Sequence, residues 1–545
     1  MNMIRYILTI FFILSAISIK AMPPHPDLDK KLKDKGQTWI DTRAKAPEDF
    51  LVSESKSTPQ KAAVIQGSSS ATVRIPVLFV VYGTPYSASS DIYTFFKRDK
   101  DKFQYMLVIL TITLLLIFAS KKAKIKLKPA FGFLAIATIT MFASCGTEDV
   151  DDELDFPTDI SLYDRMLNGT DNFTLSARKY FSDMSNGNLT VHFDFYGPVR
   201  VSKPWYYYGE NTGAPGTDAH PGELVSEAIR LMVAKYSSTD FSIYDSNKDK
   251  KVDAIIVIHE GPGEEFVGDP DTIWSHEYDL NSAKVMYKDG YGPIYTDGVY
   301  FNTYTTVPEY NSTRGESTIG VFCHELGHAL GLPDLYDTSN QTYGVGDFSL
   351  MGTGSWGGTP AGSLPAPLLA WERYYLPLLA WERYYLGGSN WITVTELTSS
   401  LNDKEIKNIE ESREAFKIML DNTPGQNQYL ILEGKKASSS NEWYVPGTGI
   451  LITHIHEGVI TQNLSSNKVN YTSSRIHGVN IKEASGNDLW SKTNKGNGAD
   501  LYTSGGISNI PKYTDNTNYT LSTTATTKSI SDIQVGATMT FDYTP

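Results

Sequence analysis

The chain has 545 residues, 41% of them hydrophobic, which is enough for about two to four domains with substantial cores. Its formal net charge of −14 argues against a nucleic-acid partner, because such partners attract basic surfaces. The two cysteines, Cys145 and Cys323, exclude a disulfide framework.

The first 70 residues have the pattern of export and spacer segments. Arg5 and the apolar stretch from Tyr6 to Ile19 are typical of a secretory signal peptide over residues 1–21. A membrane anchor is the weaker alternative, because the apolar stretch is short for a membrane span. Residues 22–70 are polar and rich in lysine, which favours a pro-segment or a spacer. We therefore expect a secreted protein or one anchored at the bacterial cell surface.

Residues 71–101 and 158–390 are predicted to form one domain. Its first strand is a continuous apolar run, which is typical of a strand buried on both faces. Later segments alternate with the periods of strands and helices. The predicted elements are strands at 73–82, 188–199 and 254–261 and helices at 175–184 and 221–236.

Residues 102–157 do not fit this domain. Two apolar runs flank the basic stretch KKAKIKLK, and the second run ends at Cys145, before an acidic segment. This order is similar to a bacterial lipoprotein signal, which predicts lipid attachment to Cys145 and attachment to a membrane. Three interpretations are open: a membrane hairpin, a later true start of a lipoprotein, and a fusion or gene-model error.

An acidic loop precedes the predicted strand at 254–261. Asp245, Asn247, Asp249 and Asp253 offer side-chain oxygens at alternate positions, a pattern similar to a calcium-binding EF-hand loop. The match is partial, because the sixth position is not glycine and the bidentate glutamate is missing. A solvated turn rich in Asp and Asn is the alternative, and Ca²⁺ binding stays open.

The stretch at 317–331, STIGVFCHELGHALG, predicts a two-faced helix. At 100° per residue, one face is apolar and is expected to bury Cys323. His324 and His328 lie one turn apart on the other face, so one Zn²⁺ can take a nitrogen from each. Glycines at 320, 327 and 331 surround them although glycine weakens a helix, which indicates that another part of the protein approaches closely.

The residues around this helix complete a catalytic zinc pattern, HExxHxxGxxD. Asp334 is the predicted third ligand, with Asp337 as its competitor. Two histidines and one carboxylate leave a fourth position open for water. Glu325 is offset from the ligands and is the predicted general base.

Two further features follow the helix. Met351, in the stretch SLMG, is similar to the Met-turn that forms a hydrophobic floor beneath the metal in metzincins; a glycine-rich loop with a packed methionine is the alternative. The decapeptide PLLAWERYYL occurs twice, at 367–376 and 377–386. Because Pro377 cannot continue a helix without a kink, the two copies cannot occupy equivalent places in one helix. One copy is interpreted as a duplication or an assembly error.

Residues 391–545 are rich in Thr, Ser, Tyr and Asn and contain short alternating runs. This pattern predicts antiparallel β-structure. His454 and His456 alternate along one predicted strand, and we interpret them as structural rather than as a second zinc site.

Several of these stretches together resemble the immune inhibitor A family of secreted metallopeptidases. They include GVFCHELGHALGLPDLYD, GDFSLMGTGSW, KVDAIIVIHEGPGE and YFSDMSNGNLTVHFDFYGPV. The resemblance implies a metzincin-like α+β fold, with a mixed β-sheet, an active-site helix and a β-rich C-terminal portion. It also implies a zinc enzyme whose substrates are proteins or peptides, and it places the strand pair at 428–456 against the catalytic part. We expect a monomer.

These observations predict a zinc endopeptidase that uses Glu325 and a metal-activated water. The rival is a lipid-anchored binding or structural protein on a zincin fold that no longer cuts. The insert at 102–157 and the duplicated decapeptide motivate this rival. The intact HELGH motif argues against it, because an idle site has no need of Glu325.

Overall fold

The computed structural model describes residues 20–23, 25, 71–83 and 156–545, apart from 157, 170–174, 214–217, 287–291, 312, 316, 377–390, 424, 426, 438–442, 472–475, 487–488, 491–493 and 515–521. The predicted signal peptide up to residue 19, the predicted lipid site at Cys145 and the second decapeptide therefore lie outside the described residues. Within the described ranges, no helix combines the length and the apolar character needed to span a membrane.

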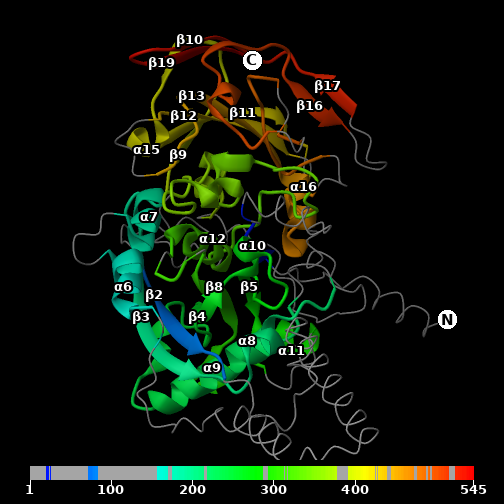
Figure 1. Ribbon diagram of the computed structural model, residues 1–545. Helices are drawn as coiled ribbons and strands as arrows, with labels where there is room; N and C mark the ends of the chain where they lie inside the picture. Colours follow the sequence, from blue (N-terminus) through cyan, green and yellow to red (C-terminus); the bar gives the residue numbers. More distant parts are fainter. Residues whose placement is uncertain are drawn as a thin grey trace, which may run out of the picture. The chain divides into compact units, whose positions relative to one another are not determined.

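A six-stranded mixed sheet organises the first part of the chain (Figure 1), in the order β1-β5-β8-β4-β2-β3. The strands are β1 Lys20–Ala21, β2 Ala71–Val81, β3 Leu189–Arg200, β4 Ile255–Pro262, β5 His276–Asp279 and β8 Thr303–Tyr310. Strands β3, β2, β4 and β8 run parallel, whereas β5 is antiparallel to β8 and β1 is antiparallel to β5. A strand from the N-terminal segment therefore covers the edge of β5.

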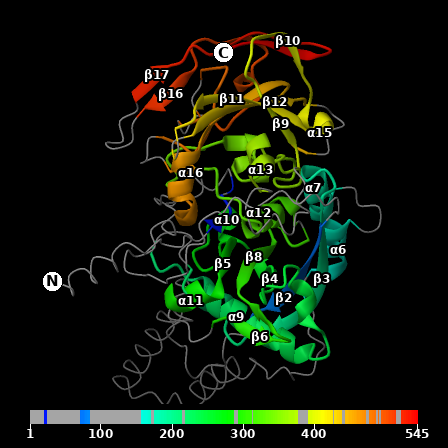
Figure 2. The ribbon, with the colours of Figure 1, turned by 180° about the vertical axis from the view of Figure 1, so that it is seen from behind.

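Helices cover both faces of this sheet (Figures 1 and 2). Because side chains alternate along β2, Leu78 and Val80 point to one face and Phe79 to the other. The first face packs on α9, and the second packs on Tyr163 of α6, which contacts Phe322 of α12. The helices are α6 Ile160–Asn168, α7 Ala177–Met184, α8 Trp205–Gly209, α9 Pro221–Lys235, α10 Glu264–Val267, α11 Leu280–Met286 and α12 Ile319–Ala329.

Short elements complete this part of the fold. They are the 3₁₀ turns η2 Phe241–Tyr244, η3 Gly346–Phe348 and η4 Thr353–Trp356, and the hairpin of β6 Ile294–Thr296 and β7 Val299–Phe301. The predicted strands and helices match β2, β3, β4, α7 and α9 to within a few residues. The predicted α+β architecture with a mixed sheet is confirmed.

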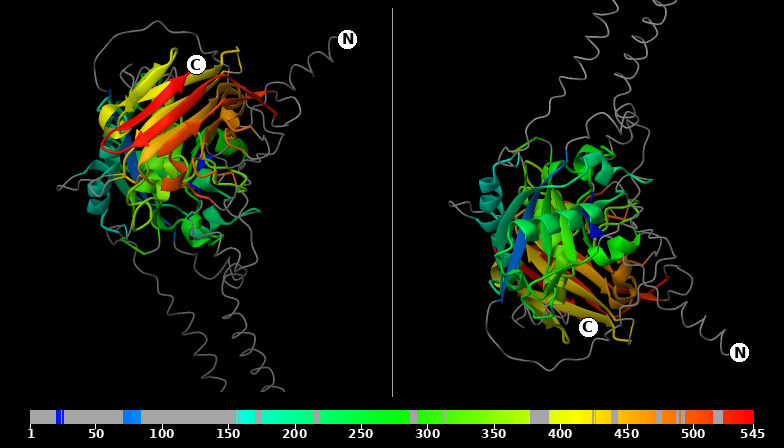
Figure 3. Two further views of the ribbon diagram at one scale, coloured as in Figure 1. Left: turned by 90° about the horizontal axis from the view of Figure 1, so that it is seen from above. Right: turned by 90° about the horizontal axis from the view of Figure 1, so that it is seen from below.

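The C-terminal part contains two facing sheets (Figure 3). One has the order β14-β13-β12-β11-β9 and the other β10-β19-β18-β15, and a single apolar core joins them. All pairings are antiparallel as predicted, except that β9 runs parallel to β11. The strands are β9 Thr393–Glu396, β10 Leu401–Ile406, β11 Glu414–Asp421, β12 Gln428–Lys435, β13 Gly449–His456, β14 Val479–Ile481, β15 Ser504–Ile507, β18 Ser529–Val535 and β19 Met539–Thr544.

The remaining elements of this part are short. They are the hairpin of β16 Pro511–Thr514 and β17 Ser522–Ala525, helices α15 Ile409–Ser412 and α16 Glu457–Asn463, and the 3₁₀ turns η6 Leu464–Ser466 and η8 Gly498–Asp500.

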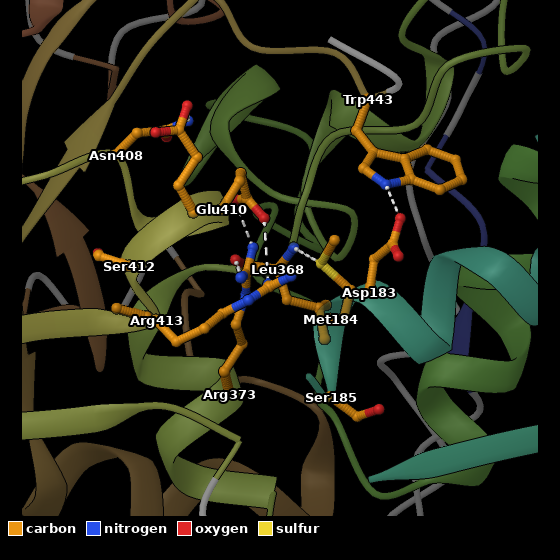
Figure 4. Close-up of polar contacts among 12 residues, drawn as sticks. Asp183, Met184, Ser185, Leu368, Arg373, Asn408, Glu410, Ser412, Arg413 and Trp443 are labelled. Atoms are coloured by element: carbon orange, nitrogen blue, oxygen red, sulfur yellow. Dashed lines mark hydrogen bonds and ion pairs between the residues drawn. The ribbon is translucent and has the colours of Figure 1, made fainter. Parts of the chain in front are cut away.

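The first decapeptide copy joins the two parts. It forms α13, Ala370–Tyr375, whose Arg373 is completely buried. Arg373 Nε donates to Leu368 O at 2.9 Å, and Nη2 donates to Glu410 Oε1 at 2.6 Å (Figure 4). Leu368 N in turn contacts Met184 Sδ on α7 at 3.3 Å. The first copy of the decapeptide therefore occupies a specific place in the core.

Helix α7 makes a further link across the predicted boundary at residue 390, because Trp443 Nε1 donates to Asp183 Oδ2 at 2.9 Å (Figure 4). Before that boundary, Tyr180 OH donates to Ala366 O at 2.7 Å. The described residues of 20–82, 156–201 and 205–545 accordingly belong to one compact unit. Residues on both sides of position 390 can therefore contribute to one site.

Candidate metal centre

Helix α12 lies at the centre of the site and is buried along its whole length. Every residue from Ile319 to His328 is buried, including Cys323, as the predicted apolar face requires. Burial raises the pKa of the Cys323 thiol, so this side chain is an inert part of the core.

The glycines on α12 allow the close approaches that the sequence indicated. A Cβ on Gly320 would lie 2.1 Å from the backbone oxygen of Ser355, and a Cβ on Gly327 would lie 2.8 Å from Met351 Sδ. Gly331 has a φ of 105°, a conformation that favours glycine, and it turns the chain toward Asp334. The helix can therefore directly contact the loop formed by residues 349–352, which we call the Met351 loop.

The structure brings His324, His328 and Asp334 together. The two Nε2 atoms are 3.1 Å apart, and Asp334 Oδ1 lies 3.2 Å from His324 Nε2 and 3.1 Å from His328 Nε2. With metal–ligand bonds of about 2.0–2.1 Å, two ligands of a tetrahedral zinc lie about 3.3 Å apart. The three side chains therefore fit one such ion, and among the described residues they form one of two clusters of this kind.

Both histidines are oriented through their other ring nitrogen. His324 Nδ1 is 2.9 Å from Leu350 O, and His328 Nδ1 is 2.8 Å from Leu332 O. Because a carbonyl oxygen only accepts, each Nδ1 must donate, and each neutral ring then directs the lone pair of Nε2 toward Asp334. Three acceptor atoms thus converge on one point, an arrangement that a cation stabilises.

Asp334 is completely buried, yet its carboxylate keeps its charge. Burial raises its pKa, but in the metal-free protein the positive charge that His328 and His324 carry when protonated outweighs burial and holds the pKa below the usual range. Asp337 is also buried, but its oxygens accept hydrogen bonds from the turn that it begins, including Ser339 N at 3.0 Å and Thr342 N at 3.1 Å. The carboxylate at the histidines is Asp334, and Asp337 stabilises its own turn.

Glu325 and Met351, the predicted general base and the predicted Met-turn residue, both lie in the core. Glu325 is fully buried and follows His324 on α12. Met351 is fully buried, and Leu335 N donates to its carbonyl at 2.8 Å, which joins the Met351 loop to the Asp334 turn.

The Met351 loop has a buried acidic anchor. Ser349 Oγ donates to both carboxylate oxygens of Glu372 on α13, at 3.0 and 2.8 Å, and accepts from Met351 N at 3.0 Å. Burial, followed by repulsion from Glu433, raises the pKa of Glu372 to about 8. The decapeptide thus supports the Met351 loop through Glu372.

The N-terminal segment contacts Trp274 and also Trp356, in the turn that follows the Met351 loop. Trp274 Nε1 donates to Met22 O at 2.8 Å, and Trp356 Nε1 donates to Pro23 O at 3.0 Å. Met22 is completely buried, and the His25 ring lies 5.0 Å from the ring of Trp356. Strand β1 also contacts α12.

The acidic loop at 245–253 folds on its own backbone. Asp245 accepts from Asp249 N at 3.1 Å and from Lys250 N at 3.0 Å, and Asn247 Oδ1 accepts from Asp249 N at 2.7 Å. Burial raises the pKa of Asp253 to about 7. Among the described residues, the carboxylates of this loop do not form a convergent cluster, so calcium binding stays a prediction.

The two histidines of β13 have different surroundings. His456 Nδ1 accepts from Val459 N at 3.3 Å and caps α16. His454 is completely buried, and burial lowers its pKa. Neither belongs to a convergent metal cluster within the described residues.

Asn467 contacts Asp334, although nothing in the sequence indicated this contact. Asn467, 133 residues after Asp334, exchanges two hydrogen bonds with it. No sequence motif marks Asn467, because it lies in an irregular turn after η6.

Part of the chain is similar to known proteins. Residues 155–392 match the family described as immune inhibitor A peptidase M6, catalytic domain. Over 252 residues the chain is 31% identical to the pre-pro-metalloprotease PrtV of Vibrio cholerae serotype O1, covering 43% of this chain and 26% of that protein. Over 274 residues it is 28% identical to Immune inhibitor A of Bacillus thuringiensis subsp. alesti, covering 43% of this chain and 36% of that protein. The chain thus spans about a quarter to a third of the lengths of these relatives.

Proposed function

Because residues 155–392 match the catalytic domain of the immune inhibitor A family of M6 peptidases, we propose that this protein is a zinc-dependent endopeptidase. Its substrates are the peptide bonds of proteins or peptides. His324, His328 and Asp334 hold the metal, and Glu325 is the general base. The convergence of three acceptor atoms within 3.2 Å of one another carries this proposal.

The donor set supports zinc as the metal. Two imidazole nitrogens and one carboxylate oxygen are the ligands of catalytic rather than structural zinc sites, because they leave a position open. Zinc in such a site lowers the pKa of water and polarises the scissile carbonyl.

The protein residues then divide the work. Leu350 O and Leu332 O keep both imidazoles in the tautomer that can bind a metal. Asp334 contributes one negative charge that offsets that of the ion. Glu325 takes up the proton of the attacking water and returns it to the leaving amine.

The contacts of Met22, Pro23 and His25 support a pro-segment within 22–70. Met22 is completely buried, and Trp274 Nε1 donates to its carbonyl oxygen at 2.8 Å. Trp356, in the turn that follows the Met351 loop, donates to Pro23 O. We infer that this segment covers the site until it is removed. The leader-like pattern of residues 1–21 supports export.

The test is cleavage of casein by the wild-type chain beside Glu325→Gln, with the zinc content of both measured. We expect one zinc in each protein and a loss of about 10²–10⁴-fold in turnover in the variant, the range for general acid–base catalysis. Limited proteolysis after residue 25 should raise the activity of the wild-type chain. The absence of zinc from both would overturn the metal site.

One further outcome has a separate meaning. Zinc in both proteins without cleavage, even after limited proteolysis, would favour the rival: a lipid-anchored binding or structural protein. The insert at 102–157 motivates this rival. Labelling with a palmitate analogue tests Cys145, because an unlabelled protein has no lipid anchor there.

A further inference from the structure

The two oxygens of the Asp334 carboxylate have different partners. Oδ1 faces the Nε2 atoms of His324 and His328. Oδ2 accepts a hydrogen bond from Asn467 Nδ2 at 2.5 Å. The Asp334 side chain is completely buried and Asn467 is 2% exposed, so both bonds form away from bulk water.

A second bond fixes the orientation of the Asn467 amide. Asp334 N donates to Asn467 Oδ1 at 2.8 Å. A backbone N–H can only donate and a carboxylate can only accept, so only one orientation of the amide satisfies both. Asn467 therefore holds the backbone and the side chain of Asp334 at the same time.

The turn that carries Asn467 is itself attached to the metal-site turn. Asn467 N donates to Leu464 O at 3.0 Å. Asn470 Nδ2 donates to Leu335 O at 2.9 Å, and its Oδ1 accepts from Val479 N at 3.0 Å. The position of Asn467 relative to Asp334 is therefore set by several bonds on both sides of it.

We propose that Asn467 is a positioning residue of the metal centre, which holds Asp334 so that one carboxylate oxygen faces the two histidines. This inference rests on the proposed function. It extends the metal centre beyond residues 155–392, the region that the family match covers. The C-terminal part then completes the active site, in addition to packing against it.

The physical basis is the freedom of a carboxylate. The terminal torsion of an aspartate side chain is broad, so without a partner the group can rotate and offer a worse geometry to the ion. Groups that hydrogen-bond metal ligands typically change metal affinity by about 10–100-fold when they are removed.

The test variant is Asn467→Gly. Asn467 has a φ of 51°, which glycine also adopts without strain, so the substitution removes the amide and leaves the backbone conformation accessible. The zinc affinity of metal-free protein is measured by competition with a chelator. We expect a dissociation constant about 10–100-fold higher than that of the wild-type chain.

Two controls separate positioning from folding. Asn186→Gly makes the same change at an exposed residue with a φ of 56°, and should leave zinc affinity within about twofold. Asn470→Ala loosens the same turn but removes no bond to Asp334. The melting temperature of each metal-free protein reports the structural cost.

The outcomes decide between the two roles. The positioning role is supported if Asn467→Gly lowers zinc affinity much more than Asn470→Ala does while the two variants lose a similar amount of melting temperature. Equal losses in the two variants, or an Asn467→Gly protein that binds zinc as Asn186→Gly does, would overturn it and leave the proposed function intact. A wild-type chain without zinc would overturn both proposals.

Discussion

Two buried carboxyl groups, Asp334 and Glu372, flank the Met351 loop, and their pKa values are shifted in opposite directions. Leu335 N, next to Asp334, donates to Met351 O, whereas Glu372 holds Ser349 in the same loop. Burial is the largest influence on both and favours the neutral acid. The pKa of Asp334 nevertheless lies below its usual range, and that of Glu372 is raised to about 8.

The neighbours explain this difference. Two imidazoles face Asp334 and, when they are protonated, favour its charged form, whereas Glu433 lies near Glu372 and adds to the effect of burial. A carboxylate that stays charged in a buried site attracts a cation. One whose neutral form is favoured serves better as a hydrogen-bonding anchor. Burial alone therefore does not identify a metal ligand.

The largest expected effect comes from removing the charge of Asp334. Asp334→Asn keeps the shape but offers a neutral ligand, so zinc affinity should fall by more than the roughly 100-fold that a change outside the ligands causes. Asp337→Asn is the matched control, since Asp337 bonds only to its own turn in the contacts described above. Chelator competition measures both. Retained zinc in Asp334→Asn with loss in Asp337→Asn would reverse the assignment of the third ligand.

A second prediction concerns the pH dependence of folding in the metal-free protein. A folded carboxyl group with a raised pKa binds more protons than the unfolded chain, so its contribution to stability is lost as pH rises. For Glu372 this loss of stability is expected between pH 4.5, the ordinary pKa, and about pH 8, the pKa in the folded protein. The free energy of unfolding of the wild-type chain should fall relative to that of Glu372→Gln across this window.

Asp334 should show the opposite sign. Its folded pKa is lowered, so its contribution is present above the ordinary value of 3.8 and is lost as pH falls through the folded value. The difference in unfolding free energy between the wild-type chain and Asp334→Asn should therefore change only at pH values below about 3.8. Denaturant unfolding at a series of pH values measures both differences. Parallel curves for the wild-type chain and Glu372→Gln from pH 5 to 8 would contradict the assignment for Glu372.

The convergence of His324, His328 and Asp334 could be predicted because most of this cluster is local. His324 and His328 share one helical face by spacing alone, and Asp334 lies a short turn away. The glycines of α12 signalled close approaches, which the structure provides with Ser355 O and Met351 Sδ. The α+β fold could be predicted because its strands and helices have distinct hydrophobic periods.

The partners of those ligands could not be predicted, because they depend on tertiary structure. Asn467 reaches Asp334 across 133 residues, and a polar residue in an irregular turn carries no periodic signal. The pairing of Lys20–Ala21 with β5 was equally hidden, since such a short strand has no period of its own. The repeat of the decapeptide indicated that one copy is a duplication or an assembly error. It did not indicate that Glu372 would support the Met351 loop.

The smallest expected effect tests whether Glu372 acts through Ser349. The Ser349 hydroxyl both donates to Glu372 and accepts from Met351 N, so Ser349→Ala leaves buried groups without partners and should cost about 1–3 kcal/mol of unfolding free energy. Ser355→Ala is the control: its buried hydroxyl donates to Gly352 O at 3.3 Å, and its loss should cost about 0.5–1.5 kcal/mol. Denaturant unfolding compares the two.

Because Glu372 supports the loop mechanically, Ser349→Ala should reduce zinc affinity much less than Asn467→Gly does. An equal reduction would mean that the loop and the metal ligand are one coupled unit, and that the two carboxylates do not have separate roles.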